Sequence, residues 1–266
     1  MDIHWVYSYM KNILLITFIY AIILALSPFS KLYTQHPGCG TDAMHHHLQQ
    51  RQPSIRQLQQ IFERRWQLQR RSQSRQLYTI PVVVHLVHNG GPENISNQQV
   101  QQAIAALNDG MRNRQPFNPQ TGVDVEIEFC LAIQDPQGAT TTGITRTQST
   151  LTNLLMEPED TLMKDLIRWD PTQYLNIWIV NSITSQASGP GVAGYAYFPS
   201  SHGQREDGIV GEYNYFDAQQ ANISIFVHEA GHYLGLYHTF EGDIYSHACP
   251  FARIMEIPKM VAHSSG

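Results

Sequence analysis

Hydrophobic and polar positions alternate along much of the chain after residue 77, and this pattern predicts a sheet of several strands. Residues 78–87 combine alternation with a run of valines, which predicts a strong first strand. The same reading predicts four more strands, over residues 124–133, 174–183, 194–198 and 208–215. We therefore expect a sheet of about five strands.

Helical spacing of apolar residues predicts helices between these strands. One helix is expected over residues 96–111, and another within residues 151–169. In the first helix the positions expected to face inward are Val100, Ile104, Ala105 and Leu107. In the second helix they are Leu162, Met163, Leu166 and Ile167. Helices placed between strands of one sheet indicate an α/β architecture.

The first thirty residues are expected to direct export. Residues 13–26 form an uncharged apolar run that follows Lys11 and precedes Ser27-Pro28, as in a secretory signal peptide. A retained membrane anchor is the alternative, although fourteen residues are short for a span of about 20. We expect residues 1–30 to be cleaved and the protein to be secreted. Contact with a membrane is expected only if this segment is retained.

Charge divides the rest of the chain. Residues 31–76 contain eight basic and two acidic residues, whereas residues 77–266 contain eight basic and nineteen acidic ones. The basic block has apolar residues at helical spacing and is predicted to be a removable pro-segment, with a linker at residues 72–74. An exposed basic helix without a role is the alternative. Binding of nucleic acid is not expected, because the block is short and precedes an acidic domain.

The strongest chemical signal is the pattern H-E-x-x-H-x-x-G-x-x-H over residues 228–238. On a helix His228 and His232 lie one turn apart on one face, so both imidazoles can bind one Zn²⁺ at about 2.0–2.1 Å. Gly235 can adopt a positive φ, end the helix and turn the chain so that His238 becomes the third ligand. Three protein ligands leave a fourth position for water, as in a catalytic zinc site.

Glu229 follows the first histidine and is predicted to be the general base rather than a metal ligand. The helix that carries it is expected to begin near Asn222 or Ser224. Its core-facing residues are expected to be Val227, Ala230 and Leu234. Five fixed positions coincide by chance in about one of 10⁴ chains with this composition, so an accidental match on a surface helix is the weaker interpretation.

With this motif the chain resembles the metzincins, and most closely their pappalysin–cytophagalysin branch. The segments that carry the resemblance are residues 39–42, 143–146, 175–181, 194–199 and 238–242. The resemblance implies a zincin-like α/β (α+β) fold with a twisted mixed sheet, backing helices and an active-site helix. It also implies one catalytic Zn²⁺ and hydrolysis of protein or peptide substrates. Calcium sites cannot be assigned from the sequence.

Three cysteines, Cys39, Cys130 and Cys249, leave at least one thiol unpaired. By resemblance to metalloprotease zymogens, either Cys39 or Asp42 of the pro-segment is expected to occupy the open position of the zinc. The alternative is that Cys39 is a plain unpaired cysteine. Cys130 lies among apolar neighbours and is expected to be buried.

Other histidines and one strand are weaker candidates. The tract at residues 45–47 could bind metal, but a tract of three histidines is more often incidental. His85 and His88 fall on or beside the first strand and are expected to be structural. Residues 193–197 are a candidate edge strand that could hold an extended peptide by main-chain hydrogen bonds, with ordinary sheet packing as the alternative.

The family resemblance ends at Gly242. Residues 243–266 are expected to be an atypical, truncated tail, because Met255 and Met260 do not lie in a recognisable methionine turn. The catalytic domain is therefore expected over residues 77–242, with its lower subdomain largely missing. Two alternatives to an active enzyme follow: a weakly active or inactive zinc-binding fragment, and a binding module anchored at the surface.

Overall fold

The computed structural model describes residues 38–68, 76–117, 120 and 122–238 of the 266-residue chain. All the helices and strands in these ranges belong to one compact unit, Pro37–Gly266. The apolar run at residues 13–26, the linker at residues 72–74, Cys249 and the tail at residues 243–266 lie outside the described residues. In the described part of the chain, no helix has the length and apolar character needed to span a membrane.

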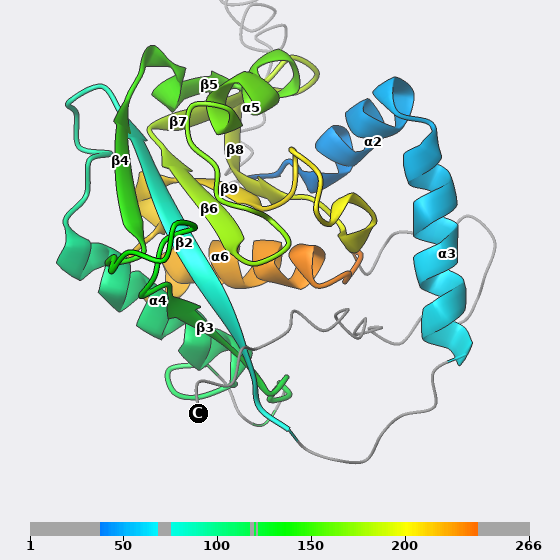
Figure 1. The fold of residues 1–266 in the computed structure, drawn as a ribbon, viewed down its shortest axis with the longest axis horizontal. Helices are drawn as coiled ribbons and strands as arrows, with labels where there is room; N and C mark the ends of the chain where they lie inside the picture. Colours follow the sequence, from blue (N-terminus) through cyan, green and yellow to red (C-terminus); the bar gives the residue numbers. More distant parts are fainter. Residues whose placement is uncertain (1–37, 69–75, 118–119, 121, 239–266) are drawn as a thin grey trace, which may run out of the picture. The chain divides into compact units, whose positions relative to one another are not determined.

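A mixed, mostly parallel sheet forms the centre of this unit (Figure 1). Within the described ranges it has nine strands, in the order β3-β2-β6-β9-β8-β7-β5, with β4 also paired to β2 and β1 to β8. β8 runs antiparallel to its neighbours β7 and β9, and β1 pairs in parallel with β8, so these two strands run against the others. The strands are β1 Gly38–Cys39, β2 Tyr78–His88, β3 Ile127–Leu131, β4 Ile144–Gln148, β5 Asn153–Leu155, β6 Leu175–Val180, β7 Ser182–Ser185, β8 Gly189–Ala196 and β9 Ile209–Glu212. The twisted mixed sheet and the α/β (α+β) class are confirmed.

The predicted number of about five strands is too low. The five predicted strands correspond to β2, β3, β6, β8 and β9, and the four missed ones are β1, β4, β5 and β7. The missed strands are two to five residues long. β4 and β7 read ITRTQ and SITS, so they lack the run of alternating apolar residues that identifies a strand in sequence.

In the part of the chain that the structure describes, five helices accompany the sheet: α2 Thr41–Arg51, α3 Ser54–Leu68, α4 Asn97–Met111, α5 Met156–Lys164 and α6 Gln220–Tyr233. Three short 3₁₀ turns lie in the same part, at Thr150–Thr152, Pro199–Ser201 and Tyr213–Tyr215. The hydroxyl of Ser96 caps α4 by accepting a hydrogen bond from the Gln99 amide. The predicted start of α6 near Asn222 or Ser224 is wrong, because the helix begins earlier, at Gln220. Just before α6, the carboxylate of Asp217 accepts the Gln219 amide at 2.7 Å.

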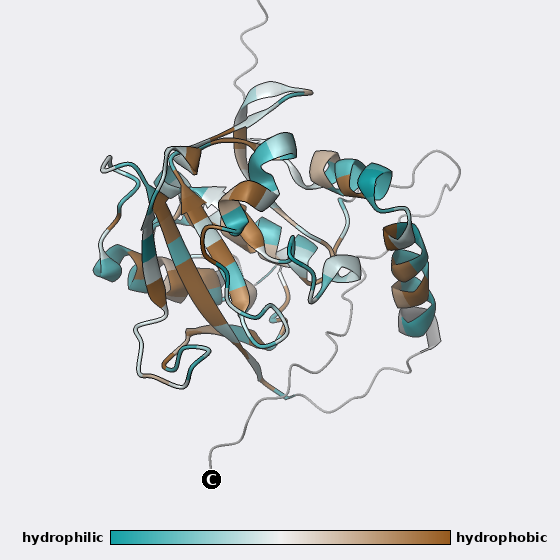
Figure 2. Ribbon diagram, turned by 45° about the horizontal axis from the view of Figure 1, so that its top comes forward, coloured by the Kyte–Doolittle hydropathy of each residue, from teal (hydrophilic) through white to brown (hydrophobic). Residues whose placement is uncertain are grey.

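One hydrophobic core lies where α4 and α6 pack against the sheet, whose central strands are predominantly hydrophobic (Figure 2). Three predicted inward residues of α4, Val100, Ile104 and Leu107, belong to this core, whereas Ala105 is exposed. Ala230 on α6 and Leu234 just after it are buried, and Val227 is partly buried against the same core. This core fixes the position of α6 beneath the strands.

A second core contains residues of the predicted pro-segment. Met44 and Leu48 of α2 and Ile55 of α3 are buried in a cluster that includes Trp178 and Tyr195 of the sheet. Full burial of such a side chain contributes about 1.5–3 kcal/mol. The basic block is therefore folded onto the sheet rather than exposed as an isolated helix.

Two predictions about burial are wrong. Of the four residues predicted to face inward here, only Met163 enters the core, whereas Leu162 is 57% exposed and Leu166 is 40% exposed. Cys130 is also exposed rather than buried. It lies on β3, where side chains alternate between faces and Ile127 and Phe129 point inward.

His85 is structural, as expected. Its ring is fully buried on β2, with Nδ1 2.7 Å from Thr145 Oγ1 and Nε2 2.9 Å from Asn176 Oδ1. Burial lowers the pKa of His85 to about 4. The neutral ring therefore helps to join β2 to β4 and β6.

His85 should make the folded chain sensitive to acid. Its unfolded pKa is about 6.5, so as the pH falls towards 4 the unfolded chain binds a proton that the folded chain does not. We expect this group to remove about 2 kcal/mol of the free energy of unfolding between pH 7 and pH 5. Urea unfolding of His85→Asn at both pH values should show a smaller difference than the wild type, with His88→Asn as the control. Equal differences in all three proteins would contradict the prediction.

Candidate functional site

The C-terminal end of α6 forms a tight turn that returns the chain to the helix. The helix ends at Tyr233, and Gly235 has a φ of 98°, in the region that favours glycine. The amide of Leu236 donates to the Gly231 carbonyl at 2.8 Å, which closes the turn. His238 thereby lies beside His228 and His232, as the motif predicts.

The three imidazoles meet through their Nε2 atoms. Nε2 of His232 is 2.9 Å from that of His228 and 3.2 Å from that of His238, and His228 and His238 are 3.2 Å apart. Tetrahedral ligands at zinc–nitrogen distances of 2.0–2.1 Å lie about 3.3–3.4 Å from one another. The three nitrogens therefore fit one zinc ion with little movement.

The outer ring nitrogens explain why the inner ones face each other. His232 Nδ1 lies 2.6 Å from the Leu236 carbonyl, and His238 Nδ1 lies 3.0 Å from the Asp42 carboxylate. Both partners can only accept, so Nδ1 carries the proton in each ring and Nε2 has a free lone pair. Burial also lowers the pKa of His232 to about 4, which keeps that ring neutral. Lone pairs directed at one point suit a cation and not a hydrogen-bonded cluster.

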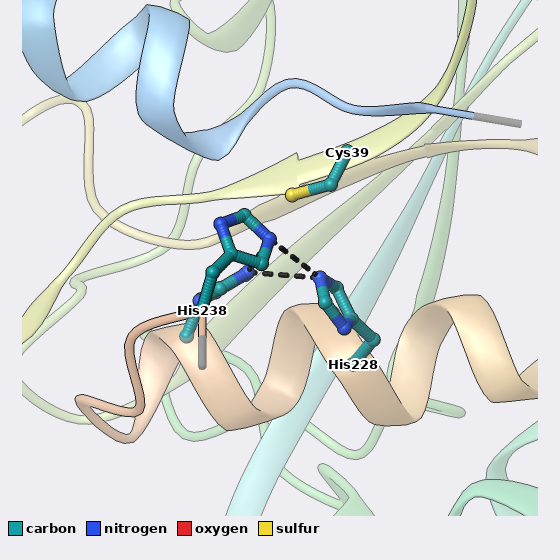
Figure 3. Close-up of side chains that lie close together, drawn as sticks. Cys39, His228 and His238 are labelled. Carbon is teal, nitrogen blue, oxygen red and sulfur yellow. Dashed lines mark hydrogen bonds between the residues drawn. The ribbon is translucent and has the colours of Figure 1, made fainter. Parts of the chain in front are cut away.

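Cys39 completes this group, and Asp42 does not. The Cys39 sulfur and one nitrogen from each of the three histidines all lie within 4.8 Å of one another. Figure 3 shows Cys39, on the segment that leads into α2, above the rings of His228 and His238. Burial and the nearby Glu229 carboxylate raise the pKa of Cys39, so a thiolate here needs a cation beside it. Asp42 instead contacts the outer nitrogen of His238.

Glu229 lies beneath the group and is only 1% exposed. Its Oε2 accepts the Thr41 hydroxyl at 2.9 Å, while its Oε1 has no hydrogen-bond partner among the described residues. Burial raises the pKa of Glu229 to about 7. A Cβ at Gly194 would lie 3.3 Å from Glu229 Cγ and 3.0 Å from the Val210 carbonyl oxygen, so glycine lets α6 approach β8 closely.

The segment before α2 also covers one side of β8. β9 pairs with Gly194 and Ala196 on one side, while on the other side β7 reaches only to Val192. There β1 pairs in parallel with β8, Gly40 donates to the Gly194 carbonyl at 2.9 Å and the Ala196 amide donates to Thr41 at 3.0 Å. In this structure β8 is therefore not an edge strand: it lies between β9 and β7, and the N-terminal segment covers the part that β7 does not reach.

Two features of the site are not evident from sequence patterns. Tyr237, just before the third histidine, accepts a hydrogen bond from Gln59 at 2.9 Å and donates to Glu63 at 3.2 Å, so α3 contacts the turn. His45 forms hydrogen-bonding contacts with Gln49 and Gln59 instead of joining the metal group. Among the described residues, the group around α6 is the one set of three or more such side chains whose ligand atoms converge.

Comparisons with known proteins agree with this geometry. Residues 159–258 match a peptidase family described as pregnancy-associated plasma protein-A. A Tannerella forsythia promirolysin mutant is 32% identical, with a TM-score of 0.62 over 76% of this chain and 69% of that one. The chain belongs to the pappalysin family. It is a zinc metalloendopeptidase of metzincin type.

Mature mirolysin resembles a smaller part of this pappalysin. A structure of T. forsythia mature mirolysin in complex with a cleaved peptide is 34% identical, with a TM-score of 0.53 over 63% of this chain and 66% of that one. Mirolysin in complex with a small compound is 33% identical over the same share of this chain and 67% of that one, with a TM-score of 0.53. Among curated proteins no match is found. The promirolysin match thus covers a larger share of this chain than the match to mature mirolysin does.

Proposed function

We propose that this pappalysin is the latent precursor of a secreted endopeptidase. In this proposal His228, His232 and His238 bind one catalytic Zn²⁺, and Glu229 is the general base. The observation that carries it is the convergence of three Nε2 atoms within 3.2 Å, two of them with Nδ1 held by an acceptor. Protein or peptide is the proposed substrate, which is supported by the cleaved peptide bound to mature mirolysin.

Each part of the site has a defined task in hydrolysis. When bound, the zinc ion supplies a Lewis acid that lowers the pKa of a water at its fourth position to about 7. Glu229 accepts the proton of the attacking water and passes it to the leaving amine. The burial that raises its pKa to about 7 also suits a group that must both accept and release a proton near neutral pH.

The substrate would use the strand edge that the N-terminal segment covers. The Gly194 carbonyl accepts a hydrogen bond from Gly40, and the Ala196 amide donates one to Thr41. Both groups lie on the side of β8 that faces away from β9, which the N-terminal segment covers in this structure. Once residues 38–41 leave, these groups can bind the main chain of an extended peptide.

The pro-segment keeps this site inactive in our proposal. The Cys39 sulfur lies where a fourth zinc ligand is required, and β1 occupies the edge of β8. Asp42, the alternative candidate for the open position of the zinc, instead orients His238 through its outer ring nitrogen. Residues 31–76 would therefore have to be removed for full activity. Arg70-Arg71 and Arg75 are the proposed cleavage points.

Replacing Cys39 should weaken latency. With alanine at this position, water can occupy the fourth zinc position in the uncut precursor, and we expect hydrolysis of a casein substrate to rise about tenfold or more. If the bond between Cys39 and zinc stabilises the blocked state by only about 1.4 kcal/mol, its loss already changes the ratio of open to blocked sites about tenfold. Cys130→Ala, at the exposed cysteine of β3, is the control and should leave latency unchanged. A Cys39→Ala precursor as inactive as the wild type would count against the thiol.

The proposed activity itself is tested on the matured chain. After limited trypsin cleavage at the arginines of residues 70–75, the zinc-loaded protein should hydrolyse casein, and a chelator should stop it. Binding of one zinc without any hydrolysis would favour the inactive zinc-binding alternative. Recovery of the protein from the culture medium, without its first thirty residues, tests secretion. Release from cells only with detergent would instead favour an anchored protein.

A further inference from the structure

The Thr41 side chain links the pro-segment to the general base. Thr41 is the first residue of α2 and is fully buried. Its Oγ1 lies 2.9 Å from Glu229 Oε2 and 3.0 Å from the Ala196 amide nitrogen. The same residue donates its backbone amide to the Cys39 sulfur at 3.4 Å. Thr41 therefore contacts the zinc-facing thiol, the edge of β8 and the catalytic carboxylate.

The direction of these hydrogen bonds is fixed by chemistry. The Ala196 amide can only donate, so it uses a lone pair of the Thr41 hydroxyl. The single proton of that hydroxyl is then directed at Glu229 Oε2, which accepts it. A water that attacks a peptide bond must also give its proton to the Glu229 carboxylate. The Thr41 hydroxyl thus donates to the general base a proton that takes no part in hydrolysis.

We propose that Thr41 is a second inhibitory contact of the precursor, which restrains Glu229 in addition to the block of the metal by Cys39. The proposal rests on the function proposed above, because it assigns a regulatory role to that same site. Cys39 removes the position for water, whereas Thr41 fixes the carboxylate and bridges it to the Ala196 amide of β8. Loss of Cys39 alone therefore leaves the base restrained, and full activity requires that Thr41 leaves as well.

The chain offers a closely matched control. Thr152 is also a buried threonine whose hydroxyl accepts a backbone amide, that of Asn181 at 2.9 Å, and donates to one acceptor, the Val87 carbonyl at 2.7 Å. It lies in the 3₁₀ turn before β5 and makes no hydrogen bond to the site. Threonine to valine keeps the shape of either side chain and removes only the hydroxyl.

The contact is tested first without metal or activity. Thermal unfolding of the full chain in chelator is measured for Thr41→Val and Thr152→Val, each with Glu229 and with Glu229→Ala. We expect Thr41→Val to lower the Tm by about 3–8 °C when Glu229 is present, and by much less when it is absent. Thr152→Val should lower the Tm equally in both backgrounds. Equal losses for Thr41→Val in both backgrounds would overturn the proposal.

The inhibitory role is tested on the uncut, zinc-loaded precursor. Adding Thr41→Val to Cys39→Ala should raise casein hydrolysis about 10- to 100-fold over Cys39→Ala alone, while adding Thr152→Val should not. No further rise with Thr41→Val would refute the inhibitory contact. If the trypsin-matured wild type hydrolyses casein while Thr41→Val has no effect, only this inference fails. If the matured wild type is inactive, the proposed function fails and the inference fails with it.

Discussion

Glu229→Ala should lower casein hydrolysis by the matured enzyme about 10²- to 10⁴-fold while zinc binding persists. Those factors are typical of a general base positioned at a reacting group. Glu229 is suited to this task because it is buried, carries one unpartnered oxygen and has a pKa raised to about 7. The group of side chains whose ligand atoms converge does not include Glu229.

Two comparisons separate this role from a structural one. Glu229→Gln keeps the shape of the side chain and should be as inactive as Glu229→Ala, because an amide cannot accept the proton of water. Both variants should contain one zinc per chain when measured by atomic absorption. Hydrolysis by Glu229→Ala at a rate near that of the wild type would eliminate Glu229 as the base.

His238→Ala should abolish both zinc binding and hydrolysis. Loss of an outer partner of a metal-binding histidine already costs about 10- to 100-fold in metal affinity, and loss of the ligand itself should cost at least about 100-fold. Metal affinity can be measured by competition with a chromogenic chelator, independently of activity. The effect should be large because His238 supplies one of three nitrogens that face one point.

His202→Ala is a suitable control for that experiment. His202 Nδ1 is 3.0 Å from the Asp207 carboxylate, just as His238 Nδ1 is 3.0 Å from Asp42, but His202 is not part of the converging group. It should retain the zinc affinity and the activity of the wild type. Equal loss of zinc in both variants would show that the histidines act through general stability and not as ligands.

The metal site follows from sequence because its spacing is local. His228 and His232 are one helical turn apart, and the positive φ of Gly235 produces the turn that carries His238. Each of these relations spans fewer than eight residues and depends on backbone geometry alone. The same reasoning predicts Glu229 as the general base, because it directly follows the first histidine of the motif.

The contacts between the pro-segment and the site could not be derived in this way. The hydrogen bond between Thr41 and Glu229 joins residues 188 positions apart, and the one between Asp42 and His238 joins residues 196 positions apart. No periodicity in the sequence determines which of two neighbouring side chains faces a metal. The family resemblance of residues 39–42 therefore left both Cys39 and Asp42 as candidates.

The fold was predicted where apolar residues form long patterns. The five strands with runs of hydrophobic residues were found, whereas short polar strands such as β7 depend on pairing with β8 and not on their own sequence. The prediction that Cys130 is buried was wrong for a similar reason: apolar neighbours in sequence do not reveal which face of β3 points inward. The orientation of that face depends on tertiary packing against α4.

X-ray absorption at the zinc edge of the uncut, zinc-loaded chain tests the central claim most directly. We predict a first shell of three nitrogens at about 2.0–2.1 Å and one sulfur at about 2.3 Å, which are the usual distances for histidine and cysteine ligands. The sulfur should vanish in Cys39→Ala and be replaced by an oxygen. A first shell without sulfur in the wild type, or without histidine nitrogens, would contradict the arrangement of His228, His232, His238 and Cys39 around one ion.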